Sequence, residues 1–91
     1  MKHIASAAIL YNGKAYTGRS HCEIGIKMVQ EGVCPRPYPG GDAQGFVDDE
    51  GVFWSRCEAA VIATAAGQVQ IGKSNREHIF NGEKLYSEDL L

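Results

Sequence analysis

Residues 44–68 carry the pattern that decides the fold, and they read QGFVDDEGVFWSRCEAAVIATAAGQ. The pattern predicts an apolar strand at 44–48, an acidic turn, an aromatic strand at 52–54 and a helix over 56–66. Ser55 and Glu58 have the spacing of a capping box, in which each side chain bonds the backbone N–H of the other residue. The alanines that follow favour a helix, and Gly67 ends it. This stretch therefore predicts a hairpin that leads directly into a capped helix.

The first third of the chain predicts the same arrangement. Strands are expected at 4–11 and 14–17, joined by Asn12-Gly13, the strongest short signal for a hairpin turn. Ser20 and Glu23 again have capping-box spacing and open a helix to about residue 30. Both helices thus begin Ser-x-Cys-Glu, a match that reflects either shared capping chemistry or an ancient duplication. We expect an α+β fold, a small antiparallel sheet of short hairpins packed with two α-helices, as a single ligand-binding domain over residues 1–91.

The overall composition limits the classes of partner. The chain has 91 residues, 44% of them apolar, and a formal charge of −2. A chain this short buries roughly 60–65% of its unfolded surface, so its core is marginal and a homo-oligomer is expected. The scattered basic residues argue against DNA or RNA as a partner, and no apolar run approaches the roughly 20 residues of a membrane span. Three cysteines without a secretory segment predict reduced thiols in a cytosol.

Residues 32–42 form the least regular segment and contain all three prolines of the chain, with Tyr38 among them. Because proline lacks a backbone N–H, neither a helix nor a central strand fits this segment. A loop of this length in a small domain is more often functional or disordered than idle.

Residues that could bind metal or carry out catalysis are present, but their spacing matches no known site. His21-Cys22-Glu23 has the H-x-E half of the zinc deaminase motif, and no P-C-x-x-C segment follows it. A zinc site of His21, Cys22, Cys34 and Cys57 has four ligands but no common spacing. The simpler interpretation is that Cys22 and Cys57 pack in the core as small apolar residues. We therefore expect no catalytic residue, no metal and no cofactor, and a protein that is not an enzyme.

Groups that recognise nucleotides are present in a favourable combination. Arg19 lies just before one predicted helix N-terminus and Arg56 opens the other, and such ends attract phosphate. Four aromatic residues can stack on a purine, although each one taken alone is more often a core residue: Tyr38, Phe46, Phe53 and Trp54.

The chain resembles the Thoeris anti-defence sponge family of phage proteins, the first described type. The resemblance rests on residues 44–47, Phe53, Arg56, Glu58-Ala59, Ile62-Ala63, residues 66–68 and the terminal residues 85–90, with Gly18-Arg19-x-His21 as a further match. It implies a protein in the cytoplasm of an infected bacterial host. There it would bind and sequester a cyclic ADP-ribose isomer, glyco-cyclic ADP-ribose, without cleaving it. It also implies a dimer or hexamer, with cyclic oligonucleotides of CBASS immunity as a second ligand class.

The resemblance also implies a site at a subunit interface. In it, Arg19 and Arg56 hold phosphates, Phe46 and Phe53 frame a base, and His21 belongs to the matched segment. Ser87 and Asp89 belong to a tail that lines the pocket, where Asp89 accepts from ribose hydroxyls. Two alternatives stay open: a small phage enzyme that degrades a cyclic nucleotide messenger, and an inhibitor that binds a host protein.

Overall fold

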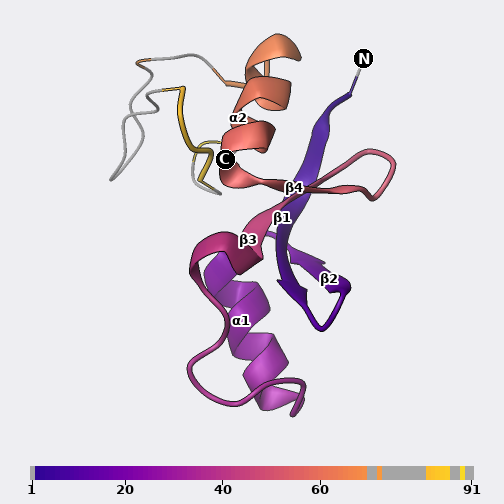
Figure 1. Ribbon diagram of the computed structural model, residues 1–91, viewed down its shortest axis with the longest axis vertical. Coiled ribbons are helices and arrows are strands. Elements are labelled where there is room, and N and C mark those ends of the chain that lie inside the picture. The colour runs from indigo at the N-terminus through magenta and orange to yellow at the C-terminus, as the bar shows by residue number, and fades with distance from the viewer. Residues whose placement is uncertain (1, 70–71, 73–81, 87–88, 90–91) are drawn as a thin grey trace.

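The computed structural model describes residues 2–69, 72, 82–86 and 89. The elements in chain order are β1 (Ile4–Tyr11), β2 (Lys14–Gly18), α1 (His21–Gln30), a short 3-10 turn η1 (Gly41–Ala43), β3 (Gln44–Asp48), β4 (Phe53–Ser55) and α2 (Arg56–Ala65) (Figure 1). The predicted elements are all confirmed, although β4 begins and ends one residue later than expected, β2 ends one residue later and α2 ends one residue earlier.

The four strands form one antiparallel sheet in the order β2-β1-β3-β4. The chain therefore consists of two hairpin–helix units, β1–β2–α1 and β3–β4–α2, and their first strands pair at the centre of the sheet. Helix α1 packs on the first hairpin and α2 mainly on the second. This arrangement confirms the predicted α+β fold with its small antiparallel sheet and two helices.

The two helices share the same start and the same end. Ser20 and Ser55 are their N-caps, and each helix is ten residues long. Gly32 and Gly67 follow their C-caps with φ of 74° and 73°, a left-handed conformation that glycine adopts without strain. Around Ser55 both hydrogen bonds of the capping box form, whereas around Ser20 the structure has only the bond from the Glu23 N–H. Equivalent helix positions therefore lie 35 residues apart.

The first hairpin has the predicted turn. Asn12 and Gly13 have φ of 51° and 78°, and positive values at both central residues define the type I′ turn that matches strand twist. The turn sets the register in which Tyr11 pairs with Lys14 and Ile9 with Tyr16.

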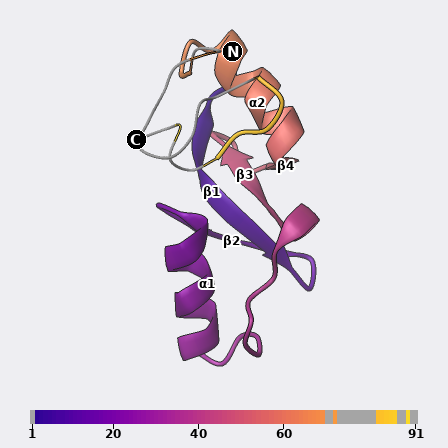
Figure 2. The same cartoon turned by 90° about the vertical axis from the view of Figure 1, so that its left-hand side faces the viewer.

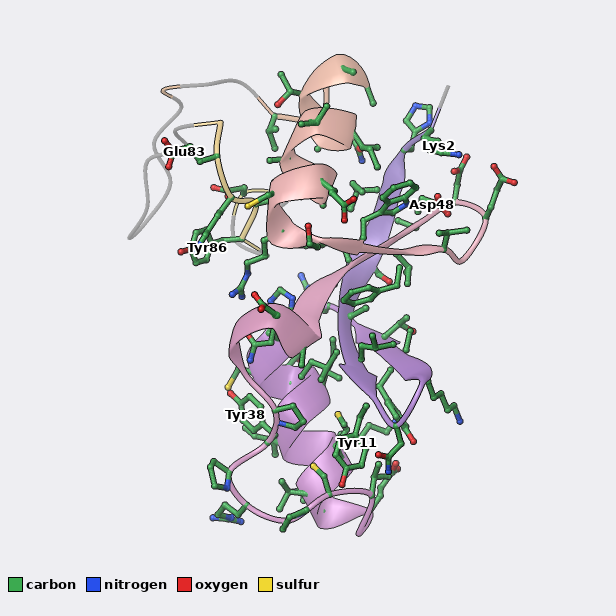
Figure 3. All side chains as sticks on the ribbon, viewed as in Figure 1. Lys2, Tyr11, Tyr38, Asp48, Glu83 and Tyr86 are labelled. Carbon is green, nitrogen blue, oxygen red and sulfur yellow. The ribbon has the colours of Figure 1, made fainter. Side chains whose placement is uncertain are left out.

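Asp48 organises the second hairpin, which the sequence pattern had indicated only as an acidic solvated turn. The side chain is 2% exposed, and its Oδ1 accepts from the N–H groups of Glu50 (2.8 Å) and Val52 (3.0 Å). Its Oδ2 accepts from Trp54 Nε1 at 2.9 Å, and Figure 3 shows Lys2 close by. The Trp54 hydrogen bond lowers the pKa of this carboxyl, assisted by the two backbone donors and Lys2, although burial opposes the shift.

One continuous core lies between the helices and the sheet. Its largest fully buried side chains include Phe46, Ile9 and Met28. Leu85 joins this core with no exposed surface, and its N–H donates to the Arg56 carbonyl at 3.0 Å. Leu85 thus docks this part of the chain on the core, whereas Leu90 and Leu91 lie outside the described residues.

The cysteines do not occupy the predicted positions. Cys22 and Cys57 are exposed, and Cys34 is the buried one, so the interpretation of the first two as core residues is wrong. The buried face of α1 carries His21, Ile24, Gly25 and Met28, a spacing that places Cys22 to the side of this face, about 100° from His21.

Candidate functional site

The N-termini of α1 and α2 meet at the middle of the molecule (Figures 1 and 2). His21 and Arg56 are the first residues of their helices, and they occupy equivalent positions in the two units. Arg56 Nη2 contacts His21 Nδ1 at 3.2 Å and donates to Gln44 Oε1 at 2.9 Å. The two helix ends, each with a partial positive charge, therefore converge beside one guanidinium.

The contacts of His21 assign its ring hydrogen. The side chain is 5% exposed, and its Nε2 lies 2.7 Å from the Gly45 carbonyl oxygen. A carbonyl oxygen only accepts and a guanidinium only donates, so Nε2 carries the hydrogen and Nδ1 accepts from Arg56. The imidazole also meets Phe46 edge-on, with centroids 5.2 Å apart and planes at 82°. His21 thus holds Arg56 in position, and both of its ring nitrogens are engaged.

Arg56 is the central cation of this site. Its guanidinium lies 4.8 Å from the centre of the Tyr86 ring, which Figure 3 shows beside the first turn of α2. Its Nε is buried and has no hydrogen-bond partner within the described part of the chain. An unpaired buried donor costs roughly 1–3 kcal/mol, so an acceptor that reached this N–H would be favoured.

A hollow of about 120 Å³ opens next to Arg56 at the start of α2. It is lined by Gly41, Asp42, Gln44, Ser55, Arg56, Cys57 and Lys84. The two positive charges of Arg56 and Lys84 outnumber the single negative charge of Asp42, so the lining carries a net positive charge. Ligand pockets usually measure about 300–1,000 Å³, so the hollow of one chain has room for a phosphate group but not for a dinucleotide.

The structure brings some of the predicted site residues together and separates others. Arg56, His21 and Phe46 form one contact chain, but Phe46 has no exposed surface and packs beneath His21. Phe53 pairs with Val47, so alternation along β3 and β4 puts its ring on the other face of the sheet, over Gly45. One chain therefore does not bring Phe46 and Phe53 to the same base.

Two further predicted residues, Arg19 and Asp89, lie outside this contact chain. Arg19 is exposed in the link between β2 and α1. Asp89 Oδ2 accepts from the Tyr86 N–H at 2.9 Å. Because the Tyr86 ring contacts the Arg56 guanidinium, Tyr86 links this carboxylate to the site. Ser87 lies outside the described residues.

Sequence reasoning missed Gln44, Lys84 and Tyr86 as parts of the site. Gln44 carried a usable signal, because alternation along β3 puts it on the same face as Phe46. Lys84 and Tyr86 carried none, since only the docking of Leu85 beside Arg56 brings them there.

Two other features of the described residues bear on function. The part of the chain that the structure describes has two α-helices, α1 and α2. Neither is long and apolar enough to span a membrane. Across residues 2–69, 72, 82–86 and 89, no three His, Cys, Asp or Glu side chains are grouped so that they could hold a metal ion.

Comparison with known proteins identifies the family. The chain belongs to the family described as phage T4 y16D protein, whose model matches residues 3–91. Comparisons with curated proteins and with solved structures gave no match. The family match supports a phage protein.

Proposed function

For this member of a phage protein family, we propose that the chain binds and sequesters a cyclic ADP-ribose isomer, glyco-cyclic ADP-ribose, without cleaving it. The protein acts in the cytoplasm of the infected bacterial host, where removal of the messenger keeps its immune effector silent. The observation that carries the proposal is the preorganised Arg56 guanidinium at the convergence of two helix N-termini. The resemblance to the Thoeris sponge family provides the identity of the messenger.

The geometry favours a pyrophosphate over a neutral ligand. Arg56 is held by His21 and Gln44 before any ligand arrives, so little side-chain entropy is lost on binding. Lys84 adds a second positive charge across the same hollow. Charge-assisted bonds from arginine to phosphate oxygen are about twice as strong as neutral ones. A sponge needs nanomolar affinity, about −12 kcal/mol, and this cluster provides its anionic part.

The same contacts support binding without cleavage. Hydrolysis of a pyrophosphate needs a general base or an activated water close to the phosphorus. His21 is the imidazole nearest to Arg56 among the described contacts, and its nitrogens face Gly45 and Arg56 instead of the hollow. A messenger held here therefore meets donors, and His21 offers it no free base.

A second copy of the chain completes the site in this proposal. The hollow of about 120 Å³ leaves the purine and the riboses of the messenger uncovered. A marginal core also favours association of subunits. Arg19 is exposed, and the Phe53 ring lies on the other face of the sheet from Phe46, so both are then available to the neighbouring subunit in a dimer or hexamer.

The test is calorimetry with glyco-cyclic ADP-ribose, followed by heat denaturation and chromatography of the released ligand. We expect tight binding and release of intact ligand. Lys84→Ala weakens binding about tenfold without disturbing the fold, because Lys84 is exposed. Arg56→Ala weakens it by at least tenfold, and its thermal unfolding is recorded because Arg56 also binds His21 and Gln44. Arg36→Ala, an exposed arginine on the proline-rich loop, is the matched control and leaves affinity unchanged.

Three results would overturn the proposal. If titration with the messenger produces no heat, the proposal is wrong, and a cyclic oligonucleotide is then the next ligand to titrate. Recovery of a cleaved product shows an enzyme that degrades the messenger. Equal affinities of the wild type, Lys84→Ala and Arg56→Ala show that the ligand binds elsewhere.

A further inference from the structure

A larger cavity lies at the other end of α1, away from the Arg56 site. It measures about 340 Å³ and opens between the C-terminal half of α1 and the proline-rich loop that runs alongside it (Figure 2). Its lining consists of Ile26, Val29 and Gln30 from the helix and Arg36, Pro37 and Tyr38 from the loop. The cavity shares no lining residue with the hollow at Arg56.

The loop wall of this cavity is preformed. A methyl group on Gly25 would overlap the Cγ, Cδ1 and Cδ2 atoms of Tyr38, so the aromatic ring rests directly on the helix backbone. Figure 3 shows Tyr38 between the loop and α1. Burial raises the pKa of its hydroxyl, and a hydrogen bond with Cys22 adds to this shift. The ring is thus held against the helix, and the neighbouring prolines have restricted φ.

The cavity lining is mostly apolar and contains one charged side chain, that of Arg36. Ile26 is 48% exposed, and Val29, Pro37 and the Tyr38 ring complete the apolar surface around it. Arg36 is the charged residue in the lining, and no carboxylate of the described residues pairs with it. A ligand for this surface therefore combines an apolar body with a negative group.

The size of the cavity limits the ligand further. An apolar cavity of about 150 Å³ accommodates benzene. The cavity of about 340 Å³ has about twice that volume and therefore fits two fused rings with a small substituent. A flat ring system also suits the slot between a helix and a loop wall formed by Pro37 and Tyr38.

We propose that this cavity is a second ligand site, which takes a planar two-ring aromatic carboxylate with its rings against Ile26 and Val29 and its carboxylate on Arg36. The site is separate from the Arg56 cluster, and it stands whether or not the messenger binds there.

The probe for this site is 2-naphthoate, and its uncharged match is naphthalene-2-carboxamide. Titration of the full chain, followed by backbone amide NMR shifts, gives both the affinity and the location. For a ligand of this size we expect a Kd on the order of 1 mM or tighter, with the largest shifts along α1 and residues 36–38. The naphthoate should bind about tenfold tighter than the carboxamide, because only the carboxylate pairs with Arg36.

Two variants and a control separate the contributions. Arg36→Gln removes the tenfold preference for naphthoate and leaves the affinity for the carboxamide unchanged. Ile26→Trp fills the cavity from an exposed position and abolishes binding of both probes. Lys14→Gln, an exposed cation at the start of β2, changes neither affinity.

Three outcomes would overturn the proposal. These are no saturable binding of naphthoate at about 10 mM, shifts that map outside α1 and the loop, and a charge preference that survives in Arg36→Gln. Arg36 does not line the hollow at Arg56, so failure of naphthoate binding does not affect the messenger proposal. Failure of messenger binding likewise does not affect the proposal for this cavity.

Discussion

Substitution of Gly25 by alanine sets two physical effects of opposite sign against each other. Gly25 lies inside α1, where alanine is favoured over glycine by about 1 kcal/mol because it restricts the unfolded chain and suits the helix. Helix propensity alone therefore predicts a more stable protein. The structure predicts the reverse, because the new methyl group would overlap the ring of Tyr38 at Cγ, Cδ1 and Cδ2.

The magnitude follows from which atoms collide. The overlapping atoms lie at the base of the ring, so a small rotation of its tip does not relieve them and the whole side chain must leave. Overpacking of this kind costs about 1–3 kcal/mol. After the gain of about 1 kcal/mol in propensity, we expect Gly25→Ala to lower the free energy of unfolding by up to about 2 kcal/mol.

A double-mutant cycle isolates the collision. In a Tyr38→Ala background the three atoms nearest to the new methyl group are gone, so Gly25→Ala should raise the free energy of unfolding by about 1 kcal/mol. Urea unfolding followed by far-ultraviolet circular dichroism measures all four proteins. Lys27→Ala, an exposed change on the same helix, is the control and should stay within about 0.5 kcal/mol of the wild type. A stabilising Gly25→Ala in both backgrounds would refute the packing of Tyr38 on this helix.

Three further predictions concern the hairpins and the loop. The lowered pKa of Asp48 stabilises the fold above the unfolded value of about 3.9, and this contribution is lost as pH falls through the folded pKa. Asp48→Asn should therefore be less stable than the wild type at pH 7, with a gap that closes in acid; a gap constant down to pH 2 would contradict this. The pKa of Tyr38 is raised, so its contribution is complete below about pH 10 and disappears as pH rises through the folded value. An alkaline titration of tyrosine absorbance should lose its latest step in Tyr38→Phe, and an unchanged curve would contradict the assignment. Gly45→Ala places a methyl group against the Trp54 carbonyl oxygen and the Phe53 ring, and should cost about 2–3 kcal/mol in urea unfolding; near-neutral stability would show that β4 pairs differently.

The convergence of the two helix ends gives the repeated sequence pattern a structural meaning. Ser-x-Cys-Glu opens both helices, and the residue at the second position is histidine in one unit and arginine in the other. These two residues contact each other across 35 positions of the chain. The difference at this one position gives one helix start a cation and the other the group that orients it.

Part of the candidate site could be predicted from the sequence. Arg56 could be named from its place at a predicted helix start, where phosphate affinity is a local property of the backbone. His21 was named only as part of the segment that carries the family resemblance. Their mutual contact could not be predicted, because it depends on β1 and β3 pairing at the centre of the sheet. The burial of Phe46 and the position of Phe53 on the other face have the same origin.

The sequence by itself determined the features whose energies are local. Asn12-Gly13 set the first turn, Ser55 with Glu58 capped α2, and Gly67 ended it, because each acts through backbone conformation within a few residues. Tertiary structure alone decided the order of the strands, the orientation of Cys22 and the burial of Asp48. These depend on contacts between segments far apart in the chain, whose free energy is gained only once both hairpins and both helices are packed together.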